Sequence, residues 1–441
     1  MRKESLFNIF FKLTSIVTDF FPKSGAHFLD FVFLNILGNK ILIWFLSKQA
    51  ELRISKIKEF NKILVVSDLN IGDSVICSSG VTAFRKIFPK AEIDYVVKKS
   101  AVKLLSGNQD ISNLYGLFVG APYPNENDLK ELSSLAESKR YDCIINYSPM
   151  INDKIFGEKN VINYSLMVAG LVKNEKNKQS INSISYKAYE FIMNLFGSNL
   201  TLNSKEKFTG PKVFLSDEAV KKAEEFLHSN NVFFNLPIIM FNPETTAKFT
   251  RIPLTTQIEI LNKLLNYQCQ ILLGSSRVEK GIELKLFNSL PEFKKNKIII
   301  IPDSFKLDAF TALIDFSDIF ITGDTGPLHL AAARKYYNNN KSLRNKTAVF
   351  SIFGSTPSRM YGFDSKTTGF FAANQDAPSR AFISKTPCRN ITCINKLAKT
   401  CKEVRCFNGL DVDEIISESV QYLKSIGKHL AVLDSNSYIS R

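Results

Sequence analysis

The 441-residue sequence lacks an apolar run that is long and uninterrupted enough to predict a membrane-spanning helix. Its most apolar window, Phe28–Leu46, is broken by an aspartate, two asparagines and a lysine. A spanning helix needs about 20 predominantly apolar residues, so this window predicts a poor span. The lysines and aromatic rings that alternate through residues 1–60 fit better with basic amphipathic helices. Such helices either lie on an anionic membrane surface or pack on the protein.

The sequence also lacks a signal peptide and a nucleic-acid-binding motif. No small-residue cleavage site follows a compact apolar core near the N-terminus, so we expect a cytoplasmic chain. The net charge of +15 and the isoelectric point near 9.3 favour anionic partners such as acidic lipids or phosphorylated sugars. Because no recognition helix or RNA-stacking motif accompanies this charge, nucleic acid is not an expected partner.

Cysteines are few, seven in all, and four of them lie close together in the sequence. Cys388, Cys393, Cys401 and Cys406 have the spacing C-x4-C-x7-C-x4-C. Structural zinc sites usually use tighter pairs, and disulfides are rare in the cytosol. The cluster therefore favours packed thiols, with a disulfide or a zinc site as the alternatives.

The remaining composition predicts two α/β domains. Hydrophobic residues make up 45% of the chain, and short apolar runs alternate with helical stretches in both halves, which predicts parallel, doubly wound sheets. The expected strands are Ile63–Val66, Ile93–Val97, Tyr115–Val119, Cys143–Tyr147, Ile238–Phe241, Gln270–Leu273, Ile298–Ile301, Ile319–Ile321 and Thr347–Phe353. We place the domains at residues 61–230 and 231–425, after the helical extension 1–60 and before a polar tail, 426–441. Ligands of such sheets bind beyond the carboxyl ends of the strands, here in the cleft between the domains.

The loop after the first predicted strand is the first candidate site. It contains Asn70, Gly72 and Asp73 and leads into a helix that runs to about Phe88. A carboxylate at the end of a strand, beside a glycine that lets a substrate approach, is a candidate general base. The alternative is that Asp73 caps the helix, and position alone favours the cap.

The stretch Ile319–Tyr336 predicts a strand, a glycine turn and a helix N-terminus. Gly323 and Gly326 bracket the turn, and Pro327 suits the first helical position. This arrangement aims free N–H groups and a positive dipole end at one point, where phosphates bind. Asp324 would repel phosphate, so we expect it to hold the turn or to accept a bond from a ligand hydroxyl. An ordinary turn without a ligand is the alternative.

A third polar loop, residues 242–253, follows another predicted strand. Its adjacent hydroxyls at Thr245 and Thr246, together with Lys248 and Arg251, have the chemistry to clamp phosphate oxygens. The alternative is a solvated polar loop.

Four segments, in this order, resemble glycosyltransferase family nine, the bacterial ADP-heptose:lipopolysaccharide heptosyltransferases and their relatives. They read ILVVSDLNIGDSVICSSGVTAFRKIFPKAEIDYVV, NPETTAKFTRIPL, ITGDTGPLHLAAA and IFGSTPSRMYGF, and the resemblance extends over residues 61–425. It implies a GT-B architecture, in which two Rossmann-like domains face each other across a cleft. It also implies an inverting transfer from a nucleotide sugar that uses no metal and no other cofactor.

The resemblance also implies roles for matching residues. The proposed base of the family falls on Asp73, and its phosphate-binding hydroxyls fall on Thr245 and Thr246. Its donor-binding group falls on Asp324, Thr325, Gly326 and His329. One departure is that Thr250 stands where the family usually has a lysine, so either Lys248 or Arg251 replaces that cation or the activity is altered.

We therefore expect an enzyme that transfers heptose from ADP-heptose to a lipid-linked or phosphorylated glycan acceptor, such as a lipopolysaccharide core. A peripheral position on the cytoplasmic face of the inner membrane fits the basic, aromatic residues 1–60. The family's Gly-x-Glu motif reads Gly274-Ser275-Ser276, which leaves the nucleotide and sugar open. One alternative is a transferase that uses a UDP- or GDP-hexose for capsule or protein glycosylation. Another is a catalytically idle scaffold that binds a nucleotide sugar.

Overall fold

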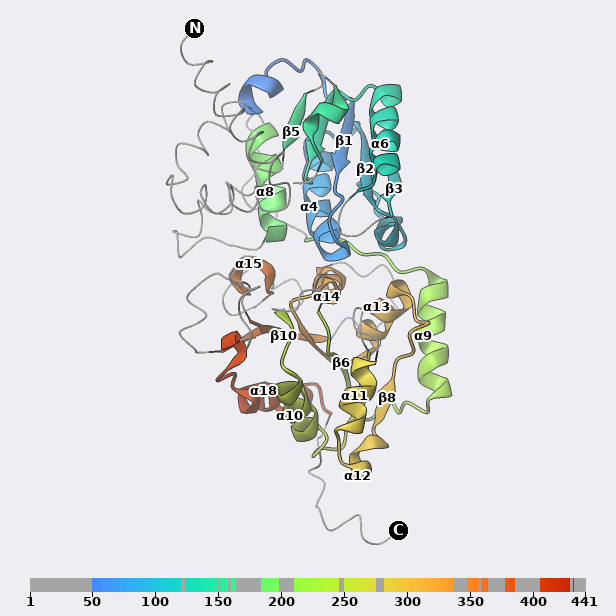
Figure 1. Ribbon diagram of the computed structural model, residues 1–441, viewed down its shortest axis with the longest axis vertical. Helices are drawn as coiled ribbons and strands as arrows, with labels where there is room; N and C mark the ends of the chain where they lie inside the picture. The colour runs from blue at the N-terminus through green and yellow to red at the C-terminus, as the bar shows by residue number, and fades with distance from the viewer. Residues whose placement is uncertain are drawn as a thin grey trace.

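The structure is a computed structural model with two α/β lobes stacked along its long axis (Figure 1). It describes residues 50–119, 124–148, 151–157, 160–163, 184–197, 210–245, 250–274, 281–336, 347–354, 356, 358–363, 377–384, 405–428 and 431. Most of the predicted helical extension, 1–60, lies outside these residues, as do Cys388, Cys393 and Cys401. Cys406, the fourth member of that cluster, is buried in the second lobe.

The first lobe holds a five-stranded parallel sheet in the order β3-β2-β1-β4-β5. Its strands are β1 (Lys62–Val66), β2 (Glu92–Lys98), β3 (Asn113–Phe118), β4 (Cys143–Asn146) and β5 (Val161–Asn163). Its helices are α4 (Ile71–Ile87), η1 (Lys99–Ala101), α5 (Val102–Leu105), α6 (Glu126–Lys139), η2 (Asp153–Phe156) and α8 (Ile184–Phe196). Four of the predicted strands are confirmed within two residues at each end, and β5 was not predicted.

Alternate side chains of β1 pack into two different cores, one on each face of the sheet. Ile63 and Val65 belong to a core formed with α4 and α8, whereas Leu64 and Val66 pack with residues of α6. Successive side chains of a strand point to opposite faces, and all four are fully buried. A continuous apolar run of this kind is typical of a parallel strand covered by helices on both sides.

The second lobe holds a six-stranded parallel sheet in the order β11-β10-β9-β6-β7-β8. Its strands are β6 (Ile238–Asn242), β7 (Gln270–Leu273), β8 (Ile298–Ile300), β9 (Ile319–Gly323), β10 (Ala348–Phe353) and β11 (Ser379–Ile383). Its helices are α9 (Asp217–Ser229), α10 (Leu254–Leu264), α11 (Ile282–Asn288), α12 (Glu292–Lys295), α13 (Leu307–Phe316), α14 (Gly326–Tyr336), α15 (Ser358–Tyr361), η6 (Arg405–Phe407) and α18 (Val412–Ser425). β11 was not predicted, and Pro327 is the second rather than the first residue of α14.

The helices of the second lobe also form two layers. The face of the sheet that carries Met240 and Phe320 packs against α13 and α14, and α9 packs on α13. The opposite face, with Phe241 and Ile321, packs against α10, α11 and α18. No helix in the described part of the chain is long and apolar enough to cross a membrane.

The segment that joins the lobes is bonded to both of them. The Phe214 N–H donates to the Leu104 carbonyl of the first lobe at 2.9 Å. In the second lobe, Nη1 of the buried Arg334 donates to the Val213 carbonyl at 2.9 Å. The same guanidinium bonds Asp315 through Nε and Nη2, at 2.8 and 2.7 Å. This buried, paired guanidinium therefore anchors Val213 of the linker to α14.

Candidate active site

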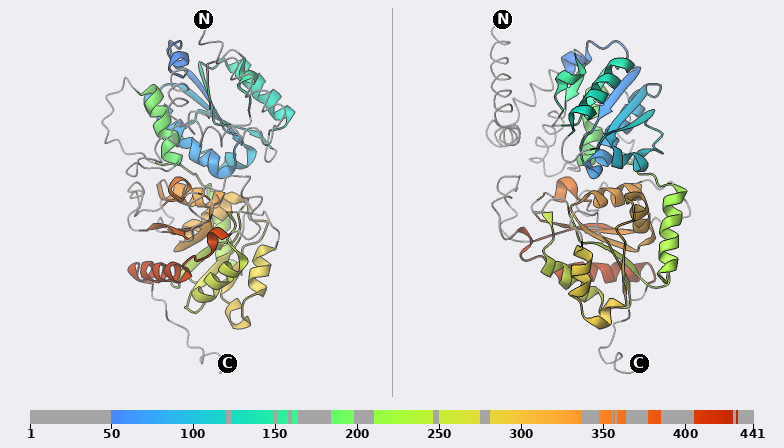
Figure 2. Two further views of the ribbon diagram at one scale, coloured as in Figure 1. Left: turned by 60° about the vertical axis from the view of Figure 1, so that its left-hand side comes forward. Right: turned by 45° about the vertical axis from the view of Figure 1, so that its right-hand side comes forward.

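The two lobes meet at the first turns of α4 and α14. A Cβ added to Gly72 would lie 2.7 Å from Cδ2 of His329 and 3.1 Å from Cα of Gly326. Figure 1 shows α14 directly below α4, and the two turned views in Figure 2 keep α4 at the end of the first lobe that faces the second. Two helix N-termini therefore converge on one point, and each supplies free N–H groups and a partial positive charge.

Asp73 lies in the first turn of α4 and is half-buried. The N-cap is Asn70, which makes no side-chain capping bond, so the prediction that Asp73 caps the helix was wrong. Burial raises the pKa of Asp73 to about 6, and the neighbouring carboxylates Asp324 and Asp68 act in the same direction. The ammonium of Lys98 lowers it. A carboxyl that titrates near neutral pH at a junction between lobes has the properties of a general base.

Asp324 follows β9 and faces Asp73 from the second lobe. Burial raises its pKa to about 6, and the hydroxyl of Thr356 acts in the opposite direction. The sequence predicted that Asp324 would hold its own turn or accept from a ligand. In the structure its carboxylate also repels that of Asp73, because both lie at the contact between α4 and α14.

His329 lies in the first turn of α14 and is 5% exposed. Its ring packs edge-on against Phe363, with the ring centroids 5.6 Å apart, and covers Gly72. Burial lowers the pKa of His329 to about 4, so the imidazole is neutral at physiological pH. Among the described residues Nδ1 has no hydrogen-bond partner, which leaves one polar atom of this ring available to a ligand.

Two predicted donor residues, Thr245 and Thr325, belong to a buried polar cluster at the ends of β6 and β9. Nδ2 of Asn242 donates to Oγ1 of Thr322 at 2.9 Å and to Oγ1 of Thr325 at 3.4 Å. The Thr250 hydroxyl donates to that of Thr245 at 3.0 Å. A Cβ at Gly323 would lie 2.9 Å from Cγ2 of Thr245. The structure therefore brings Thr245 and Thr325 together at the carboxyl ends of adjacent strands.

Arg251, one of the two cations predicted to bind phosphate in loop 242–253, contacts a carboxylate of the protein itself. Nη2 of Arg251 lies 3.5 Å from Oε1 of Glu244, a carboxylate with no exposed side-chain surface. The charge of Arg251 is therefore already paired with a carboxylate of the protein, and the residue is not an unpaired cation for phosphate. Thr246 and Lys248, the other two residues predicted for this clamp, lie outside the described residues.

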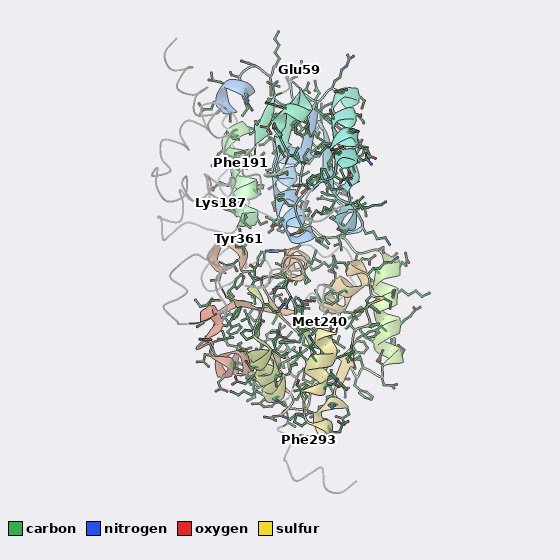
Figure 3. The ribbon with its side chains drawn as sticks, in the orientation of Figure 1. Glu59, Lys187, Phe191, Met240, Phe293 and Tyr361 are labelled. Carbon is green, nitrogen blue, oxygen red and sulfur yellow. The ribbon has the colours of Figure 1, made fainter. Side chains whose placement is uncertain are left out.

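Three residues near Asp73 were not predicted to belong to the site. Lys98 ends β2, and its Nζ donates to Oδ1 of Asn70 at 3.3 Å. Asp68 is 2% exposed in the loop after β1. Tyr361 lies at the lobe boundary in Figure 3, where Asp73 and Asp324 add to burial in raising the pKa of its hydroxyl. Lys98 could have been found from the sequence, because it stands at the carboxyl end of the strand next to β1.

Comparison with known proteins identifies the family. The family model described as "Glycosyltransferase family 9 (heptosyltransferase)" matches residues 169–396, which are 228 of the 441 residues. The chain belongs to glycosyltransferase family 9. This membership makes the protein a glycosyltransferase and confirms the resemblance that four of its loops predicted.

Relatives of this family 9 chain are distant in sequence. A Haemophilus influenzae protein named "Putative glycosyltransferase" is 22% identical over 297 residues, which cover 64% of this chain and 83% of that protein. The family 9 glycosyltransferase of Veillonella parvula has a TM-score of 0.61 at 14% identity, covering 83% of this chain and 98% of its own. E. coli heptosyltransferase WaaC, solved with ADP, has a TM-score of 0.51 at 13% identity, covering 82% and 99%. These likenesses confirm the predicted GT-B fold.

The close approach of the two lobes predicts different results for two glycine substitutions. In Gly72→Ala the new methyl would overlap the His329 ring and crowd Gly326, so the free energy of unfolding should fall by about 1–3 kcal/mol. In the matched control Gly326→Ala, the methyl would meet only the Gly72 nitrogen at 3.6 Å, and stability should not fall. Urea titrations measure both variants, and an undiminished stability of Gly72→Ala would contradict this contact.

The raised pKa of Asp73 predicts a cost in stability at neutral pH. The folded protein keeps a proton on Asp73 up to about pH 6, whereas the unfolded chain loses it near 3.8. Stability is therefore lost as the pH rises through this window. Asp73→Asn should raise the free energy of unfolding by about 3 kcal/mol at about pH 7.5, and by only about 1 kcal/mol at about pH 4.5.

Urea titrations at both pH values measure this gain, with the exposed Asp303→Asn as the matched control. The control substitution should change the free energy of unfolding only slightly, and by the same amount at both pH values. A destabilised Asp73→Asn variant at neutral pH would show that the carboxylate is a structural group.

Proposed function

We propose that the protein transfers heptose from ADP-heptose to a hydroxyl of a lipopolysaccharide core or related glycan, with inversion at the anomeric carbon and without a metal. The observation that supports this most strongly is the position of Asp73, which faces the turn between β9 and α14 across the junction of the lobes. That turn and Asp73 belong to different lobes, so each lobe can bind one of the two substrates.

The second lobe supplies the donor side of this proposal. The N–H groups at the start of α14 and the hydroxyl of Thr325 would bind the diphosphate, because a helix N-terminus favours anions. Charge builds up on the diphosphate as it leaves, so donors fixed at this point stabilise the transition state. His329 is neutral, and its Nδ1 has no hydrogen-bond partner within the described part of the chain, which fits a hydrogen bond to the donor.

The first lobe supplies the base. An ionised Asp73 would take the proton of the acceptor hydroxyl while that oxygen forms a bond to the anomeric carbon and the bond to the diphosphate breaks. Attack from the face opposite the diphosphate inverts the configuration in a single displacement. Asn70 and Gly72 precede Asp73 at the start of α4 and would lie on the acceptor side, and Asn70 is exposed.

One observation favours the second candidate, an idle scaffold that binds nucleotide sugars. Thr250 replaces the lysine usual in the family, and its hydroxyl bonds Thr245 inside the lobe. Arg251 pairs with Glu244, so neither residue offers an unengaged cation to a departing diphosphate. A transferase that uses a UDP- or GDP-hexose stays a further alternative.

Removal of the base separates these candidates. Asp73→Asn should lower kcat/KM for transfer from ADP-heptose by about 10²–10⁴-fold, the usual contribution of a general base. Binding of ADP should be unchanged, because its contacts come from the second lobe. In the wild type kcat/KM should rise with pH through about 6 as Asp73 ionises.

Melting temperatures in ADP, UDP, GDP and CMP supply the binding measurement, since a ligand of the native state raises the melting temperature. The proposal expects the largest rise with ADP, of equal size in both proteins. Equal stabilisation without detectable transfer by the wild type would favour the scaffold.

The acceptor is proposed to be held at the cytoplasmic face of the inner membrane. The net charge of +15 and the basic, aromatic composition of residues 1–60 support contact with anionic lipid. The protein should therefore sediment with vesicles that contain phosphatidylglycerol and remain in solution with neutral phosphatidylcholine vesicles. Equal sedimentation with both would contradict an electrostatic membrane contact.

A further inference from the structure

Two buried charged residues lie side by side behind Asp73 in the first lobe. β1 and β2 are parallel, with Val66 opposite Val96, and the Ser67 N–H donates to the Val96 carbonyl at 2.9 Å. Continued by two residues, this register places Asp68 next to Lys98. Burial raises the pKa of the Asp68 carboxyl, and a hydrogen bond with Ser148 and the Lys98 ammonium act in the opposite direction.

These two residues are poorly explained as structural groups. Asp68 and Lys98 are only 2% and 7% exposed, and burying charges costs several kcal/mol per ion. Among the described residues Oδ1 of Asp68 has no hydrogen-bond partner. The Ser148 hydroxyl hydrogen-bonds the Asp68 carboxyl, but its unbonded Oδ1 still costs free energy, so we look for a functional reason for the pair.

The bond between Lys98 and Asn70 fixes the ammonium beside the first turn of α4. Asn70 is the N-cap of that helix, and Asp73 is the third residue after it. The side chain of Lys98 therefore ends close to the carboxylate that we propose as the base. Asp68 precedes the same turn by two residues, so both charges reach Asp73 from within one lobe.

We propose that Lys98 and Asp68 are positioning residues that place one positive and one negative charge behind the first turn of α4, beside Asp73. The positive charge of Lys98 favours the ionised form of Asp73. The negative charge of Asp68 raises the affinity of Asp73 for a proton, so that it remains a sufficiently strong base. The role in transfer rests on the proposed function, whereas the electrostatic effect on Asp73 can be measured without turnover.

Among the described residues, the other titratable groups around Asp73 are neutral, paired, exposed or part of the second lobe. Burial raises the pKa values of Cys77 and Tyr95 far above neutral pH, and it raises that of Tyr361 as well. His329 is neutral above about pH 4. On α8, which packs along α4, Lys187 is paired with Glu190, and Lys99 of η1 is exposed. Within the described part of the chain, the charges that act on Asp73 are therefore Lys98, Asp68 and Asp324.

The pH dependence of kcat/KM tests the proposal, because its acid limb reports the base of the free enzyme. Lys98→Met should move the midpoint of this limb upward by about one pH unit, and Asp68→Asn should move it downward by about one. The double variant should return towards the wild type, and Lys98→Arg should keep the wild-type midpoint. The matched control is Lys139→Met, which removes a lysine that pairs with Glu92 on the same lobe and should not move the midpoint.

A direct titration distinguishes failure of this proposal from failure of the proposed function. The carboxyl carbon of Asp73 can be followed by NMR in protein carrying ¹³C-labelled aspartate, with Asp73→Asn identifying its signal. Opposite shifts of the Asp73 signal in the Lys98→Met and Asp68→Asn proteins support the proposal even if no transfer is detected. The absence of transfer would count against the proposed function alone. An unmoved Asp73 titration in both variants, each with a cooperative melting transition, overturns the proposal.

Discussion

Contact between the first turns of α4 and α14 is the constraint on which the rest of this site depends. Only glycine at position 72 leaves room for Gly326 and the His329 ring. Two helix N-termini from different lobes thus point at one place, and their partial positive charges offset the two carboxylates that also lie there. Burial at this contact raises the pKa of Asp73 to about 6, and repulsion from Asp324 across it acts in the same direction.

The arrangement divides the work between the lobes. The second lobe presents N–H groups and hydroxyls around Thr325, which suit a diphosphate. The first lobe presents a carboxylate whose proton affinity is raised by burial and limited by Lys98. Because Asp324 belongs to the other lobe, its effect on Asp73 depends on how closely the lobes approach. The base would then be strongest when donor and acceptor sides are together, which suits a reaction between two bound substrates.

Much of this fold could be predicted from the sequence because parallel strands are continuous apolar runs and the turn after β9 has clear glycine signals. β5 was missed because it is an edge strand of only three residues, and β11 because it is an edge strand in which Ser379 and Arg380 interrupt the apolar run. The role of Asp73 could be proposed but not separated from helix capping, since that depends on which residue begins α4. The pairing of Arg251 with Glu244 and the approach of Lys98 to Asp73 are tertiary contacts, and local patterns carry little information about them.

A crystal structure with ADP and a heptose acceptor fragment tests the central claim most directly. The account predicts the β-phosphate on the N–H groups of Thr325 and Gly326, with an acceptor hydroxyl within hydrogen-bond distance of Asp73, about 2.6–3.2 Å. A diphosphate bound away from the start of α14, or an acceptor hydroxyl that no hinge motion brings to Asp73, would contradict it.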